Sequence, residues 1–222
     1  MTDIFKRNGR RNQKGYTISD TTGNPITPGE VGIEIEVEGR NLPKIQSILP
    51  ATWNYHNDGS LRGEDNAEYV LARPLSFSDV PAAVNDLWDK FKKYETVLDD
   101  SNRTSVHVHL NVQTFHMNRL CAFAALYFSV EELLTEFCGE NRVGNLFCLR
   151  AKDAPNIITC FKRLLREEVG PGSIAENFKY GGLNVYAISK FGSLEVRTMR
   201  GVSDADSVIQ WVSILQRIYE LS

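Results

Sequence analysis

The sequence predicts an α+β protein in which helices cover one face of an antiparallel sheet. Segments 31–38 and 105–112 alternate strictly between apolar and polar residues, as strands do when only one face is buried. Segments 183–188 and 193–200 predict an antiparallel hairpin near the C-terminus. Helical apolar periodicity occupies three long segments, at 80–94, 117–137 and 205–221.

Composition places the chain among ordinary globular proteins. It has 222 residues, 42% of them apolar and 24% charged, with a net charge of −3. We expect a flexible basic tail at 1–15 and one domain at 16–222. The charge gives no strong nucleic-acid signal, and neither a signal peptide nor an apolar run of ~20 residues for a membrane is expected. Four cysteines without metal-binding spacing favour a reducing, cytoplasmic setting.

Turn residues and caps delimit the shorter elements of the first half. A short strand is predicted at 16–19, with turns at 23–25 and 28–29. Asn41 to Leu49 predicts a short helix, with Asn41 as its cap and Pro43 in its first turn. The next segments are an extended region from Trp53, a turn at 57–60 and a strand at 67–71.

Capping residues delimit the later helices. Ser78 or Asp79 is expected to cap the helix at 80–94. A further amphipathic helix is predicted at 154–169, ended by the glycines of 170–172. Ser203 or Asp204 would cap the last helix, whose predicted buried stripe is Val208, Trp211, Val212, Leu215 and Ile218.

The first alternating segment carries three carboxylates on one face. Glu34, Glu36 and Glu38 alternate with apolar residues, so they point to the same side of the strand. Three neighbouring carboxylates repel one another, and each loses free energy if it is shielded from water. The row is either a solvated strand face or a set of hard oxygen ligands for Mg²⁺ or Mn²⁺.

The second alternating segment carries two histidines on one face. His107, His109 and Asn111 share a side, and their i, i+2 spacing brings the imidazole rings within reach of one ligand. Paired strand histidines also occur as simple polar surface. A metal or phosphate contact and a structural role therefore both fit this pattern.

Two further strands contribute charged groups from one face. Glu68 points away from its apolar neighbours, and Glu195 shares a face with Arg197, where a minor ion pair is the simplest explanation. Four such faces with almost no lysine are unusual for a solvated sheet, and an acidic hollow needs cations to neutralise it. Arg197 and Arg200, with Lys179 upstream, would supply positive charge for a phosphate or carboxylate.

The order of these motifs resembles that of the amidoligases, a family of the carboxylate–amine ligase superfamily with glutamine synthetase and glutamate–cysteine ligase. The resemblance extends from about Gly32 to Arg200 and rests on GxExE, DGS followed by a strand glutamate, HxH, and a basic residue and Asn ahead of ExR. It implies a glutamine-synthetase-like catalytic fold. In that fold an antiparallel funnel or half-barrel packs helices on its convex face and holds Mg²⁺ (or Mn²⁺) and ATP.

The resemblance also implies roles for individual residues. The metal ligands would be Glu34, Glu36, Glu68, His107 and Glu195. Arg197 would bind the transferring phosphate or the substrate, and His109 would orient phosphate or the acyl group. Nucleotide or substrate contacts are expected from Asp58, Asn111, Lys179, Asn184 and Arg200. Lysine at 179, where the family usually has arginine, would lose bidentate phosphate binding.

The implied activity is ATP-dependent amide-bond formation through an acyl phosphate, with a small-molecule, peptide or protein carboxylate and an amine as substrates. A metal-dependent hydrolase or nuclease that needs no ATP is an alternative use of the same residues. A non-catalytic ligase fold that binds a partner is a third. The amphipathic C-terminal helix leaves two packings open, on the sheet or on a second copy in a homo-oligomer.

Overall fold

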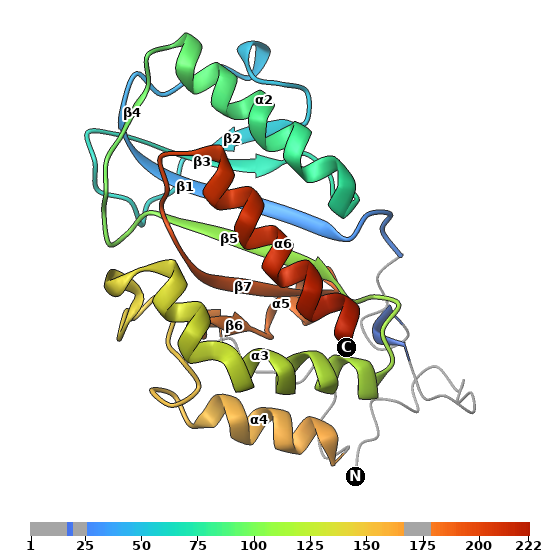
Figure 1. Cartoon of the computed structure of the whole chain (residues 1–222). Helices are drawn as coiled ribbons and strands as arrows, with labels where there is room; N and C mark the ends of the chain where they lie inside the picture. Colours follow the sequence, from blue (N-terminus) through green and yellow to red (C-terminus); the bar gives the residue numbers. More distant parts are fainter. Residues whose placement is uncertain (1–16, 20–25, 167–178) are drawn as a thin grey trace.

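The structure is a computed structural model that describes residues 17–19, 26–166 and 179–222 (Figure 1). It is an α+β fold with a seven-stranded, open antiparallel sheet, as the alternating patterns predict. The expected tail at 1–15 and the turns at 23–25 and 170–172 lie outside the described residues. None of the helices in the described part is long and apolar enough to cross a membrane.

The sheet places the two alternating strands at its centre. Its strands are β1 (Val31–Arg40), β2 (Trp53–His56), β3 (Asp65–Leu71), β4 (Val97–Leu98), β5 (Ser105–Asn111), β6 (Leu183–Asn184) and β7 (Ser193–Arg200). Their order is β2-β3-β1-β5-β7-β6, and β4 pairs with the end of β1. The strands that carry the polar faces, β3, β1, β5 and β7, are therefore consecutive neighbours.

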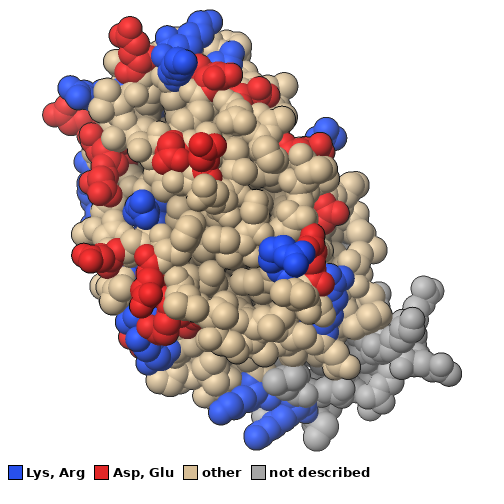
Figure 2. Space-filling model, viewed as in Figure 1, with Lys and Arg blue, Asp and Glu red and all other residues tan. Residues whose placement is uncertain are grey.

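Helices α2, α3 and α6 lie across one face of this sheet (Figure 1). The described helices are α2 (Val80–Lys93), α3 (Met117–Cys138), α4 (Asn156–Leu165), α5 (Ala187–Phe191) and α6 (Ala205–Leu221). Three short 3₁₀ turns span Gln46–Ile48, Phe77–Asp79 and Glu140–Arg142. All five residues of the stripe predicted for α6 are buried. The helix-covered surface has few charges at its centre (Figure 2).

Strand alternation builds the core between the sheet and the helices. Ile33 and Ile35 of β1 and Val106 and Val108 of β5 are buried in one apolar cluster with the helix stripes. Each such side chain contributes roughly 1.5–3 kcal/mol by leaving water. That stabilisation holds the opposite, polar face of the same strands in place.

The helix predicted from Asn41 to Leu49 is wrong except for the 3₁₀ turn Gln46–Ile48. Asn41 has a φ of 59°, and the Leu42 N–H donates to Oδ2 of Asp65 rather than to a helical carbonyl. Pro43 lacks an N–H and disfavours helical backbone at the residue before it. The short strand predicted at 16–19 is reduced, within the described residues, to one bridge between Thr17 and His116.

The strand predicted at 183–188 is also wrong beyond Asn184. The Asn184 side chain accepts the N–H of Tyr186 through Oδ1, and this hydrogen bond turns the chain away from β7. The chain then forms the short helix α5, and Gly192, with a φ of 68°, ends that helix. The expected hairpin turn at 191–192 is therefore the C-terminus of a helix, and of the strand predicted at 183–188 only Leu183 and Asn184 pair with β7.

The capping predictions for α2 and α6 have different outcomes. Asp79 occupies the N-cap position of α2 without a side-chain hydrogen bond to the backbone. Asp204 caps α6, because its Oδ1 accepts the N–H of Ser207 at 2.8 Å.

Replacing this cap should destabilise the protein. We expect Asp204→Ala to lower the free energy of unfolding by about 1 kcal/mol, since the first turn of α6 loses an acceptor. Urea unfolding followed by circular dichroism measures the change. Asp206→Ala removes a carboxylate from the same turn without removing the cap, so an equal loss in that variant would contradict the assignment.

Candidate active site

Strand register brings the four polar faces together. The pairing of β1 with β5 places Glu34 opposite His107, and that of β5 with β7 places His109 opposite Glu195. The pairing of β1 with β3 places Glu36 opposite Glu68. Directly paired residues point to the same face with Cβ atoms about 5 Å apart. Groups that are distant in sequence therefore form one cluster on the face opposite α2, α3 and α6.

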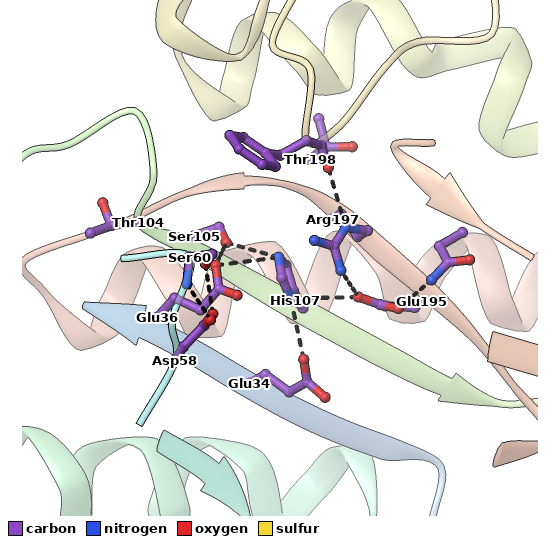
Figure 3. A network of polar contacts seen from close by, with 12 residues as sticks. Glu34, Glu36, Asp58, Ser60, Thr104, Ser105, His107, Glu195, Arg197 and Thr198 are labelled. Atoms are coloured by element: carbon purple, nitrogen blue, oxygen red, sulfur yellow. Dashed lines mark hydrogen bonds and ion pairs between the residues drawn. The ribbon is translucent and has the colours of Figure 1, made fainter. Parts of the chain in front are cut away.

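His107 lies at the centre of this cluster (Figure 3). Its Nδ1 is 3.2 Å from Oε2 of Glu34 and 3.5 Å from Oε1 of Glu195. Its Nε2 is 2.8 Å from Oγ of Ser105 and 3.7 Å from Oε2 of Glu36. The side chain is 3% exposed, so the imidazole links three carboxylates in a region from which water is excluded.

His109 lies beside the same carboxylates. Its Nδ1 is 3.0 Å from Oγ of Ser193, and its Nε2 is 3.2 Å from Oε1 of Glu34. The second contact is poorly aligned for a hydrogen bond, so the buried Nε2 is left without a well-oriented partner. One ligand atom from each of Glu34, His109 and Glu195 can lie within 4.8 Å of the other two.

Glu195 is held on both of its oxygens. Asn184 donates through Nδ2 to Oε2, and Arg197 donates through Nη1 to Oε1. Arg197 also donates from Nε to the Phe147 carbonyl. The buried guanidinium of Arg142 donates to the Arg197 carbonyl at 2.7 Å and so supports the strand at this point.

The two histidines determine which carboxylates stay ionised. Burial raises the pKa of Glu34, but close contacts with His107 and His109 and their charges outweigh it and hold the pKa well below the usual range. Burial likewise raises the pKa of Glu195, and the charges of His107 and Arg197 lower it below normal. For His109, burial lowers the pKa, and contact with Glu34 raises it above normal.

For Glu36 and Glu68, neighbouring positive groups do not offset the effect of burial on the pKa. Burial raises the pKa of Glu36 above its ordinary value, although His107 opposes the shift. Burial, followed by the charges of Glu34, Glu36, Asp58 and Glu195, raises the pKa of Glu68 to about 7. Carboxylates thus outnumber the positive groups that stabilise them, and a divalent cation would restore the balance. The donor set of carboxylate and imidazole fits Mg²⁺ or Mn²⁺.

Two hollows flank the cluster. The larger has a volume of about 480 Å³, is lined largely by apolar groups, and includes Glu34 and His109 in its lining. The smaller has a volume of about 260 Å³ and is lined by four cationic side chains together with acidic ones. The cationic residues of the smaller hollow are Arg103, Arg142, Lys179 and Arg197.

Several predicted residues lie at the edges of the cluster. Asp58 and Lys179 line the smaller hollow, and Asp58 accepts hydrogen bonds from the N–H and Oγ of Ser60. Asn111 lines the larger hollow, but its Nδ2 is used by the carbonyls of Thr27 and Gly29. Asn184 contacts Glu195, as described above. Asn111 and Asn184 therefore support the site within the chain.

Two predicted residues do not join the cluster. The Glu38 carboxylate accepts the N–H of Arg62 at 2.6 Å, which ties β1 to the loop that precedes β3. Arg200 donates from Nη1 to the carbonyl of Cys138 at the end of α3, and it lines a separate hollow with Asp99 and other residues. The prediction of a nucleotide or substrate contact for Arg200 is not supported by its position.

The sequence patterns did not single out four residues of the site. Ser105 occupies the position two residues before His107, so strand alternation was a usable signal for it. Ser193 has the same relation to Glu195. Arg103 comes from a turn and Arg142 from the 3₁₀ turn Glu140–Arg142, and neither is long enough for a periodic pattern to indicate a side-chain direction.

Comparison with models of known protein families gives no match. Comparison with curated proteins gives no significant similarity. The functional argument for this chain therefore rests on the site itself.

Glu68 offers a test of the acidic excess. Because its pKa is raised to about 7 in the folded state and is near 4.5 when unfolded, its contribution to stability declines as the pH rises between these values. We expect Glu68→Gln to raise the free energy of unfolding of the metal-free protein by roughly 1–3 kcal/mol at pH 8 and to change it little at pH 4.5.

Thermal unfolding at both pH values, with and without Mg²⁺, measures this effect. Bound Mg²⁺ should reduce or reverse the gain, since it favours the ionised Glu68. A gain at pH 4.5 as large as that at pH 8 would contradict the proposed charge crowding.

Proposed function

We propose that this protein is an ATP-dependent carboxylate–amine ligase of the amidoligase type, with a funnel-like, glutamine-synthetase-like catalytic sheet. The supporting observation is the position of the carboxylate–imidazole cluster between two hollows of different chemistry. One hollow is cationic and suits phosphates, and the other is apolar and suits an organic substrate. A reaction between a nucleotide and a second substrate needs this arrangement.

The cluster would hold Mg²⁺ or Mn²⁺. Glu34, His109 and Glu195 are the residues whose ligand atoms converge best, and Glu36 and Glu68 lie beside them on the same face. The geometry thus favours His109 over His107 as a ligand, because both ring nitrogens of His107 are used in hydrogen bonds, whereas the buried Nε2 of His109 is not. The cations would supply screening of the negative charge where carboxylate and triphosphate approach each other.

The smaller hollow would bind the ATP phosphates. Arg197 and Arg103 offer planar guanidinium groups, and Lys179 offers an ammonium group. Burial lowers the pKa of Arg197, but the charges of Glu195 and Glu36 raise it above normal, so its positive charge is secure. Charged donors already in place stabilise the equatorial oxygens of a transferring phosphoryl group without further rearrangement.

The reaction would proceed in two displacements. An oxygen of the substrate carboxylate attacks the γ-phosphorus of ATP, the bond to the bridging oxygen breaks, and ADP leaves with that electron pair. The amine nitrogen then attacks the carbonyl carbon of the acyl phosphate, phosphate leaves, and the nitrogen loses a proton to form the amide. His109 and Ser193 lie where they would orient the acyl group, and Arg197 would stabilise charge on the phosphoryl group.

Metal binding can be tested without turnover. We expect Glu34→Gln to weaken Mn²⁺ binding at least tenfold, because the substitution removes the carboxylate shared by both histidines. Electron paramagnetic resonance of free Mn²⁺ measures the affinity. Glu38→Gln serves as the matched control on the same strand, and equal affinities in the two variants would contradict the metal site.

Catalysis is tested by ADP release. With Mg²⁺, ATP and mixtures of carboxylates and amines, we expect Glu195→Gln to reduce release at least 100-fold, since Asn184 and Arg197 lose their shared anchor and the metals lose a ligand. Glu220→Gln, an exposed change on α6, should leave the rate unchanged. Metal-dependent cleavage of nucleic acid or peptide without any need for nucleotide would instead favour the hydrolase.

A further inference from the structure

The larger hollow carries an inference about the substrate that rests on the proposed function. We propose that this hollow binds the apolar body of the carboxylate substrate, so that the acid is one with an aliphatic or aromatic tail. Its volume of about 480 Å³ lies within the usual range for small-molecule sites, roughly 300–1,000 Å³.

The floor of the hollow exists because Gly32 has no side chain. Gly32 occupies the same face of β1 as Glu34 and pairs directly with His109 on β5. A Cβ at this position would lie 3.3 Å from the His109 Cβ, so any larger residue would fill the space beside the imidazole. The absence of a side chain at Gly32 therefore leaves space on the sheet face beside the cluster.

Val70 and Phe191 make part of the wall of the hollow apolar, where the rest of this sheet face is charged. Val70 of β3 pairs with Glu34, and it is the apolar member of a face that otherwise carries Glu68 and Asn66. Phe191 lines the hollow and is 59% exposed, and its ring centroid lies 5.7 Å from that of His109. A large aromatic side chain exposed beside a hollow is typical of a binding surface for an apolar group.

The end group of the ligand follows from which lining residues belong to the cluster. Glu34 and His109 line the hollow and contact each other, His107 joins Glu34 to Glu195, and Arg197, the partner of Glu195, lines the cationic hollow. A molecule whose tail fills the apolar hollow therefore places its head group toward the phosphates. In the proposed reaction the group that attacks phosphorus is the carboxylate, so we assign the head to the acid and not to the amine.

The charges of the lining argue against a second acidic group on the tail. Among the described lining residues, Lys190 is the one cationic side chain apart from His109, and it lies exposed at the rim, 5.1 Å from the Tyr186 ring centroid. A buried carboxylate in the apolar part would lose hydration without gaining a partner. Monocarboxylates with apolar tails fit, and dicarboxylates do not.

Calorimetric titration of the Mg²⁺-loaded protein with butanoate, hexanoate and octanoate tests this assignment. We expect the affinity to rise about fourfold for each added methylene until the hollow is filled, which corresponds to about 0.8 kcal/mol per buried CH₂. 6-Hydroxyhexanoate, which has the same carbon chain but a polar end, should bind more weakly than hexanoate.

Two substitutions localise the effect. Phe191→Ala and Val70→Thr should each lower octanoate affinity about five- to tenfold, and neither should change the affinity for MgADP. Leu133→Ala, which truncates a 66% exposed side chain on α3, is the matched control and should change neither affinity. Unfolding midpoints within 2 °C of the parent would show that the variants are folded.

The possible outcomes separate the inference from the proposed function. Affinity that does not depend on chain length, or tighter binding of hexylamine than of hexanoate, overturns the assignment of the hollow to an apolar acid. ADP release only with short or dicarboxylic acids overturns it as well, while leaving the ligase in place. In a last outcome, the affinity for the acids depends on chain length, Phe191→Ala abolishes that dependence, and no acid and amine release ADP. This result would support the assignment of the hollow to an apolar acid and would contradict the ligase activity.

Discussion

Repulsion among carboxylates on one sheet face is the constraint on which the rest of this structure depends. Glu34, Glu36, Glu68 and Glu195 are brought together by strand pairing that the apolar face enforces. His107 lies among them and contacts three of the four. Because slipping any strand by one residue would bury these charges in the core, the hydrophobic pattern and the polar cluster specify the same register.

The sequence was informative wherever a period of two extends over several residues. Alternation in β1 and β5 identified both strands and the face on which Glu34 and His107 lie, since side-chain direction follows from backbone geometry alone. The same reasoning gave a wrong prediction at 183–188, where a local hydrogen bond ends the strand. The Asn184 side chain accepts a backbone N–H two residues later and so ends a strand that apolar residues would otherwise continue.

The register shift between β5 and β7 and the course of the loops could not be predicted from the sequence, for physical reasons. Between Val106 and Val108 of β5, the partner positions on β7 move from Met199 to Val196, so two steps along one strand match three along the other. Such a bulge depends on packing over the whole sheet, and it breaks the alternation beyond Arg197. Arg103 reaches the cationic hollow from an irregular segment, whose course depends on tertiary contacts and not on periodicity.

The apolar hollow, the cluster and the cationic hollow follow one another along strand β1. Gly32 lines the apolar hollow, Glu34 belongs to the cluster, and Glu36 lines the cationic hollow. Four residues of strand span roughly 13 Å at about 3.3 Å per residue, comparable with the length of an acid in line with a phosphate group. Strand geometry therefore sets the spacing between the two hollows. Because β1 is anchored by its buried apolar face, this spacing is fixed by the fold itself, and the proposed reaction would need little ordering of the site.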